Sequence, residues 1–244
     1  MALIVVLVFA FVEFDNVPLK KGPFKEVLLA DKQAEDSIAA ADSIVEQAGE
    51  KQTVQEPDTT VKSVLLFGDS MTILVANRMG AYGKKNGYKV AAITWDASNS
   101  VGWSSADTLE KYIDKYNPDF LMVVLGSNEL FLQNFDARRP SVEKLVKKMG
   151  DIPFVWIGPP NWQEDKGFNA MMERTLPKGT FFKSEGIELQ RGPDHIHPTP
   201  AAGAIWTDSI MRWMPKSAHP ILAELPDTTM KNGVHSSVYI RAKK

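Results

Sequence analysis

Cysteine is absent from all 244 residues of the chain. This absence excludes disulfide bonds, cysteine-based zinc sites, a thiol nucleophile and lipid attachment at a cysteine. A strong charge of one sign is also missing, since 28 Lys and Arg face 30 Asp and Glu for a net charge of −2. Domains that bind nucleic acid normally carry a basic excess, so the composition argues against a nucleic-acid partner.

The first twelve residues carry no polar side chain, and this apolar run stops at Glu13. About 20 apolar residues are needed to cross a bilayer, so the run is short for a full span. It also lacks a basic start and a small-residue cleavage site. Three interpretations remain for residues 1–14: a truncated or tilted membrane anchor, an uncleaved or trimmed signal sequence, or a buried strand. We expect an extracytoplasmic protein, periplasmic or secreted, that its N-terminal segment tethers to the membrane.

The rest of the chain divides by composition. Five Lys and eleven acidic residues lie between Glu13 and Thr60, and the apolar residues there are too small and sparse to bury a strong helix face. Residues 15–60 are therefore predicted to be an acidic spacer. Residues 61–215 form the predicted domain, and residues 216–244 form a tail with room for a short edge strand.

Short apolar runs alternate with amphipathic stretches along the domain. Strands are predicted at Val64–Phe67, Tyr88–Thr94, Phe120–Leu125, Phe154–Ile157 and Thr180–Phe182. Helices are predicted at Met71–Lys85, Ser105–Tyr116, Ser141–Met149, Gly167–Leu176 and Pro200–Met214. This alternation is typical of a doubly wound α/β sheet whose parallel strands are covered on both faces. Ligands of such sheets bind at the carboxyl ends of the strands, where we expect the chemistry.

The first predicted strand runs directly into Gly68-Asp69-Ser70-Met71 and then a helix. A Ser at such a turn exposes its hydroxyl at the sheet edge, beside backbone N–H groups that can stabilise an oxyanion. Alternatively, Ser70 and Asp69 are ordinary helix caps.

The third predicted strand ends in Gly126-Ser127-Asn128-Glu129. The side-chain amide of Asn128 can donate to a tetrahedral oxyanion, and one such donor is worth about 3–4 kcal/mol in the transition state. The alternative is an Asn that only forms a turn.

A third loop, Asp194-His195-Ile196-His197-Pro198, precedes the last predicted helix. An Asp and a His three residues apart allow the carboxylate to orient one imidazole nitrogen while the other faces a distant Ser. A metal site is the alternative for two His and an Asp, but the spacing is not that of a typical zinc pair. His197 is preferred to His195 as the base because it completes Asp-x-x-His and precedes Pro198.

These three blocks, in this order, resemble those of the SGNH hydrolases, the GDSL esterase/lipase superfamily. The resemblance covers Val64 to Trp213. It implies a three-layer α/β/α flavodoxin-like fold with a central parallel sheet, and no cofactor or metal. It also implies that Ser70 is the nucleophile, His197 the general base and Asp194 its orienting partner.

The resemblance also implies an oxyanion hole made by the Ser70 N–H, the Asn128 side chain and a glycine N–H from a second block. The loop after the second strand offers Gly102 for this role, one residue beyond the usual spacing. A plain loop glycine is the alternative. Glu129 stands where Asp is frequent, and the sequence leaves its role open.

Tryptophans in the same loops bear on the substrate. Indole faces stack well on sugar rings, so Trp103 and Trp162 are candidate substrate contacts, with packing residues as the alternative. We expect a serine esterase that removes O-acetyl groups from an extracytoplasmic carbohydrate or peptidoglycan through an acyl-enzyme. The alternatives are an O-acetyltransferase with the same triad, a lysophospholipase or thioesterase, and a non-catalytic glycan-binding module.

Overall fold

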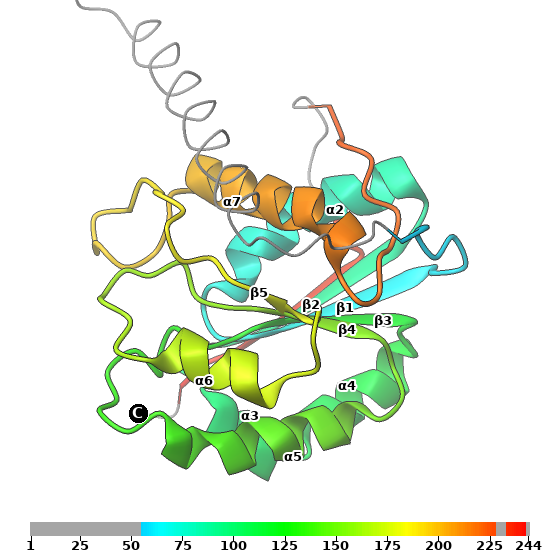
Figure 1. The fold of residues 1–244 in the computed structure, drawn as a ribbon. Coiled ribbons are helices and arrows are strands. Elements are labelled where there is room, and N and C mark those ends of the chain that lie inside the picture. Colours follow the sequence, from blue (N-terminus) through cyan, green and yellow to red (C-terminus); the bar gives the residue numbers. More distant parts are fainter. Residues whose placement is uncertain (1–54, 228–232, 243–244) are drawn as a thin grey trace, which may run out of the picture. The chain divides into compact units, whose positions relative to one another are not determined.

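The computed structural model describes residues 55–227 and 233–242 (Figure 1). The predicted anchor, residues 1–14, and nearly all of the spacer, residues 15–60, lie outside the described residues. Within the described ranges, no helix is both long enough and apolar enough to cross a bilayer.

The described chain folds around one sheet of parallel strands, in the order β5-β4-β3-β1-β2-β6. The strands are β1 (Ser63–Gly68), β2 (Lys89–Trp95), β3 (Phe120–Val124), β4 (Phe154–Ile157), β5 (Phe181–Phe182) and β6 (Ser236–Ile240). The strand order reverses beside β1, because β2 lies on one side of it and β3 on the other. This topology confirms the predicted α/β class and parallel sheet.

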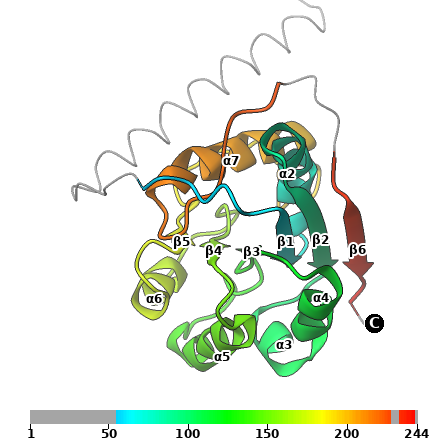
Figure 2. The same cartoon turned by 90° about the vertical axis from the view of Figure 1, so that its right-hand side faces the viewer.

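Helices cover both faces of the sheet, which gives three layers (Figures 1 and 2). One face carries α2 (Thr72–Asn86) and α7 (Pro200–Trp213). The other face carries α3 (Ser100–Ser105), α4 (Thr108–Tyr116), α5 (Arg139–Met149) and α6 (Phe168–Thr175). Two 3₁₀ turns, η1 (Asp136–Arg138) and η2 (Met214–Lys216), precede α5 and follow α7.

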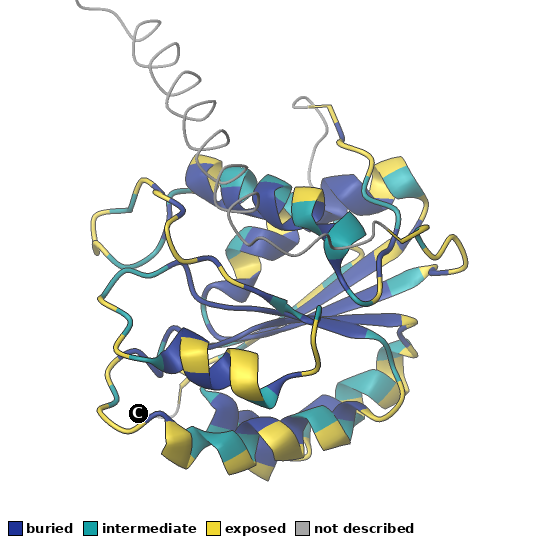
Figure 3. Ribbon diagram, in the orientation of Figure 1, coloured by how far each residue is buried: buried dark blue, intermediate teal, exposed yellow. Residues whose placement is uncertain are grey.

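The apolar runs of the sequence do not alternate with polar residues because these strands are buried on both faces. In β1, Val64 and Leu66 pack into the core under α2 and α7, whereas Leu65 and Phe67 pack into the core of the opposite face. Successive side chains point to opposite faces of a strand, so a strand covered on both sides needs apolar residues at every position. The four strands β1 to β4 are accordingly buried along most of their length (Figure 3).

The loop after β2 departs from the prediction. The helix expected from Ser105 starts three residues later, as α4 at Thr108, because the chain is extended at Ala106 and separates it from the short helix α3. The short helix α3 was not predicted. Asn99 begins it as an N-cap, since its side chain accepts the N–H of Gly102.

The tail contributes to the sheet. β6 lies parallel to β2 at the edge, and Val238 and Ile240 pack against the core. The N–H of Asp96 donates to the Ile240 carbonyl at 2.8 Å, so this strand also supports the loop after β2. The folded domain therefore extends beyond the predicted limit at residue 215.

Gly68 closes β1 at a point where two loops must approach closely. Its φ is +156°, and a Cβ at this position would lie 1.8 Å from the Val124 carbonyl oxygen of β3. Only glycine fits there. The turn to Ser70 can thus lie directly against the end of β3, which leads to Asn128.

Candidate active site

Ser70 lies between β1 and α2, at the carboxyl edge of the sheet. The buried carboxyl of Asp69 fixes this turn, since Oδ1 accepts the N–H of Met71 at 2.9 Å. Within the part of the chain that the structure describes, no group accepts the backbone N–H of Ser70. Both the hydroxyl and the backbone N–H of Ser70 are thus placed for chemistry at this edge.

Ser70 and His197 meet although 127 positions separate them in the sequence. The Ser70 Oγ lies 2.7 Å from His197 Nε2, and His197 Nδ1 lies 2.7 Å from Asp194 Oδ2. The hydrogen bond to His197 and two backbone N–H groups hold the pKa of Asp194 well below its usual range. An ionised Asp194 only accepts, so Nδ1 carries the ring proton and Nε2 is free to accept from the hydroxyl.

A tight loop before α7 presents His197. Arg191 spans this loop, donating to the Ile196 carbonyl at 2.7 Å and to the Pro160 carbonyl of the loop after β4 at 2.9 Å. Burial lowers the pKa of its guanidinium. His195 is exposed, has a left-handed φ of 58° and makes no side-chain bond to Ser70 or Asp194. The geometry thus selects His197 from the two histidines.

Asn128 follows β3 and reaches across to the loop after β2. Its Nδ2 donates to the Ser98 carbonyl at 2.8 Å. An amide nitrogen carries two hydrogens, so this bond orients the group and leaves a second N–H to donate. The turn that carries Asn128 is tied to the nucleophile turn, because the Ser127 N–H donates to Asp69 Oδ2 at 3.1 Å.

Gly102 does not offer a free N–H. It lies inside α3, and its N–H donates to Asn99 Oδ1 at 3.0 Å. The prediction that Gly102 completes an oxyanion hole is therefore corrected: this N–H caps a helix. In the first turn of α3, the N–H of Val101 is the one that has no acceptor among the described residues.

Two buried carboxyl groups lie beneath these turns. Asp69 is fully buried, and desolvation, with the nearby Glu129 as a smaller cause, raises its pKa to about 7. Glu129 is 1% exposed, and desolvation likewise raises its pKa. Glu129 Oε1 accepts the Ser100 N–H at 2.6 Å. The sequence marked Glu129 only as an unusual residue in its block, because its partner lies in another loop.

Trp103 is wrong as a predicted substrate contact. Its side chain is fully buried, donates to Ser98 Oγ at 2.9 Å and packs against Phe67 and Trp95 with ring centroids 5.0 and 5.3 Å away. The helix α3, which was not predicted, turns this indole into the core.

Trp162 is half-buried beside the site. Its Nε1 donates to Ser127 Oγ at 3.1 Å, next to Asn128. The ring of Phe131 packs edge-on against it at 5.0 Å, and 60% of Phe131 is exposed. Phe131 and Trp162 together form an aromatic pair next to Asn128. The sequence analysis did not name Phe131 as a candidate substrate contact. Its position in the same loop as Asn128, three residues further on, was the available signal.

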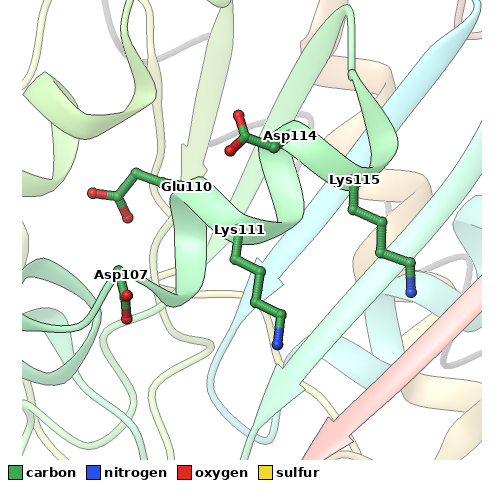
Figure 4. A pocket seen from close by; sticks show the side chains of 5 residues that line it. All are labelled: Asp107, Glu110, Lys111, Asp114 and Lys115. Atoms are coloured by element: carbon green, nitrogen blue, oxygen red, sulfur yellow. The ribbon is translucent and has the colours of Figure 1, made fainter.

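An open pocket on α4 lies apart from these groups (Figure 4). Carboxylates and ammonium groups line it together, and no predicted site residue does: its lining residues are Asp107, Glu110, Lys111, Asp114 and Lys115. A helix face of alternating charge is ordinarily a solvated surface. Across the described ranges, no group of three or more His, Asp or Glu side chains is arranged to hold a metal ion.

Comparisons with known proteins complete the description. No protein-family model matches the chain, and no curated protein matches it. Among solved structures, the chain is similar to a gut microbial diltiazem-metabolizing enzyme, at 15% identity and a TM-score of 0.37. That match covers 51% of this chain and 35% of the other, so it spans about a third of the other chain's length.

Proposed function

We propose that the protein is a serine esterase of the SGNH type that removes O-acetyl groups from a carbohydrate. One observation carries the proposal: Ser70 Oγ, His197 and Asp194 are joined by two 2.7 Å contacts at the carboxyl edge of a parallel sheet. A nucleophile, a base and an orienting carboxylate in this arrangement perform acyl transfer on unrelated folds.

In the first half of the reaction, Nε2 of His197 takes the proton of the Ser70 hydroxyl as Oγ attacks the carbonyl carbon of the ester. The tetrahedral intermediate then collapses, and His197 gives the same proton to the leaving alcohol oxygen. Ser70 is left as an acetyl ester. Asp194 remains ionised throughout and stabilises the imidazolium that forms between the two proton transfers.

In the second half, water attacks the acetyl carbon of the acyl-enzyme while His197 takes one of its protons. The second tetrahedral intermediate releases acetic acid, and the proton on His197 returns to Ser70 Oγ. The free enzyme is regenerated with one ester bond cleaved and one water consumed.

The oxyanion needs donors that are in place before it forms. The backbone N–H of Ser70 and the second amide hydrogen of Asn128 are two such donors, supported by the bond from Asn128 Nδ2 to the Ser98 carbonyl. For the third donor we propose the Val101 N–H in place of the Gly102 N–H. The Gly102 N–H is taken by Asn99 Oδ1, whereas the Val101 N–H has no acceptor among the described residues. Any residue can supply a backbone donor, so the role does not require glycine.

Two observations support the proposed substrate class. The exposed ring of Phe131, seated on Trp162, offers an aromatic surface to the sugar part of a carbohydrate ester. The chain's net charge of −2 provides no basic excess for a polyanionic substrate. An acetyl ester of a polysaccharide or of peptidoglycan meets these conditions.

We propose an extracytoplasmic location, with residues 1–14 attached to the membrane. The proposal rests on the twelve apolar residues before Glu13. Fractionation of cells that express the full chain, beside cells that express it without residues 1–14, tests this. Equal amounts in the soluble cytoplasmic fraction would contradict it.

The test of the activity is acetate release from 4-nitrophenyl acetate and from an O-acetylated polysaccharide, with Ser70→Ala as the control. We expect the wild type to release acetate and Ser70→Ala to lose at least about 1000-fold in kcat. Equal rates in both proteins would overturn the esterase. Transfer of acetyl to an added glycan without free acetate would instead identify an O-acetyltransferase.

A further inference from the structure

Glu129 is a buried acid that the proposed reaction does not use. Its side chain is 1% exposed, and Oε1 makes a 2.6 Å bond to the Ser100 N–H. Its other oxygen, Oε2, is buried and has no hydrogen-bond partner among the described residues. The Ser100 backbone and hydroxyl and the charge of Arg138 offset only part of the cost of burying this carboxyl, because desolvation still raises its pKa.

The bond to Ser100 has a specific place. Ser100 is the first residue of α3, whose N–H has no partner within the helix. The preceding loop carries Ser98, whose carbonyl accepts from Asn128. Two consecutive side chains after β3, Asn128 and Glu129, thus hold Ser98 and Ser100 in the loop after β2.

Asp69 makes the corresponding connection on the other side. Its Oδ1 accepts from Met71 in the nucleophile turn, and its Oδ2 accepts from Ser127 in the turn after β3. Asp69 therefore ties the loop after β1 to the loop after β3. Glu129 ties the loop after β3 to the loop after β2. Between them, two buried carboxyl groups connect the three loops from which an oxyanion hole would be built.

We propose that Glu129 is a positioning residue that, through the Ser100 N–H, fixes the loop after β2 at the distance from Ser70 that transition-state stabilisation requires. This rests on the proposed function. Loss of the side chain would let the first turn of α3 move away from Asn128. Ester binding would be little affected, because the oxyanion forms only after the substrate is bound.

The contact itself is tested without any reaction, by hydrogen exchange in a peptide covering residues 96–103. Glu129→Ala removes the acceptor of the Ser100 N–H, so exchange there should become about tenfold faster or more. Glu129→Gln keeps an acceptor oxygen and should stay near wild type. Thr207→Val is the matched control, because it removes a buried hydroxyl bond that lies inside α7.

The catalytic consequence is tested by steady-state kinetics on an acetyl ester with the same proteins. A displacement of about 1 Å at a reacting centre can cost roughly 100-fold in rate. Glu129→Ala should therefore lower kcat by about 10- to 100-fold with KM nearly unchanged, and Glu129→Gln should restore most of kcat. Glu129→Asp, which is one methylene shorter, should fall between them. It also keeps the test available if Glu129→Ala does not fold.

The possible outcomes separate the contact from its catalytic effect. Unchanged exchange in the 96–103 peptide of Glu129→Ala overturns the positioning role. Faster exchange with unchanged kcat shows a structural bond without catalytic effect and also overturns it. An equal kcat loss in Thr207→Val attributes the effect to lowered stability, which overturns the role as well. If wild type and Ser70→Ala are both inactive on acetyl esters, the proposed esterase fails and the catalytic role of Glu129 fails with it, while exchange still reports whether the contact exists.

Discussion

Asp194 holds His197 at two points, since Oδ2 lies 2.7 Å from the ring Nδ1 and Oδ1 accepts the backbone N–H of the same residue at 3.0 Å. The orientation of the ring is therefore set within a single turn of the chain. Ser70 and Asn128, in contrast, depend on the sheet, because β1 and β3 must be neighbours for their loops to meet. The candidate site combines one locally determined pair with two groups placed by topology.

The two histidines of this loop should differ sharply in their effect on activity. His197→Ala removes the base that contacts Ser70 and should lower kcat by about 10⁴-fold or more. His195→Ala should stay close to wild type, since His195 is exposed and has no contact with Ser70. Acetyl-ester kinetics on both variants check this. An inactive His195→Ala beside an active His197→Ala would reverse the assignment.

Asn128→Ala should lower kcat by about 100- to 1000-fold, because one oxyanion donor is lost while Ser70 and His197 keep their contact. KM should change little, since the donor acts on the transition state. Asn134→Ala is the matched control, an exposed Asn of the same loop. Equal, small effects in both variants would remove Asn128 from the oxyanion hole.

The sequence predicted the sheet because its strands are apolar at every position, as in Val64–Phe67. It predicted the contact between Asp194 and His197 because the two residues share one short motif. It could not predict α3, whose start depends on the side chain of Asn99 accepting a specific N–H. Missing α3 produced both errors at the site. Within α3, the Gly102 N–H donates to the N-cap side chain of Asn99. The helical backbone also points the Trp103 side chain into the core.

The hydrogen bonds between buried polar groups of different loops could likewise not be predicted from the sequence. Glu129 and Ser100 are 29 residues apart, and their bond exists only once β2 and β3 have taken places on either side of β1. No local pattern of residues encodes such a pairing.

Phe131→Ala should weaken binding of a glycan substrate more than that of a small ester. Loss of one aromatic contact is worth about 3- to 10-fold, so KM for an O-acetylated oligosaccharide should rise by that factor while kcat/KM for ethyl acetate stays constant. Tyr239→Ala is the control, as it removes another exposed aromatic side chain, on β6. A parallel loss on both substrates would show that Phe131 supports the loop and does not contact the sugar.

Asp69 should make the stability of the protein depend on pH in a characteristic direction. Because burial raises its pKa from 3.8 to about 7, the folded protein keeps a proton between pH 4 and 7 that the unfolded chain has released. The contribution of this group to the free energy of unfolding is thus largest at low pH and falls as the pH rises toward 7.

Asp69→Asn cannot titrate, so its free energy of unfolding should not fall in this way between pH 5 and pH 7. The difference between the two proteins should change by roughly 2–3 kcal/mol over these two pH units. Urea denaturation at both pH values measures it, with Asp114→Asn on the exposed face of α4 as the control. If wild type and Asp69→Asn lose stability in parallel, Asp69 is ionised in the folded protein throughout this range. Its bonds to Met71 and Ser127 would then be those of a carboxylate, and desolvation would not raise the pKa of Asp69 as far as 7.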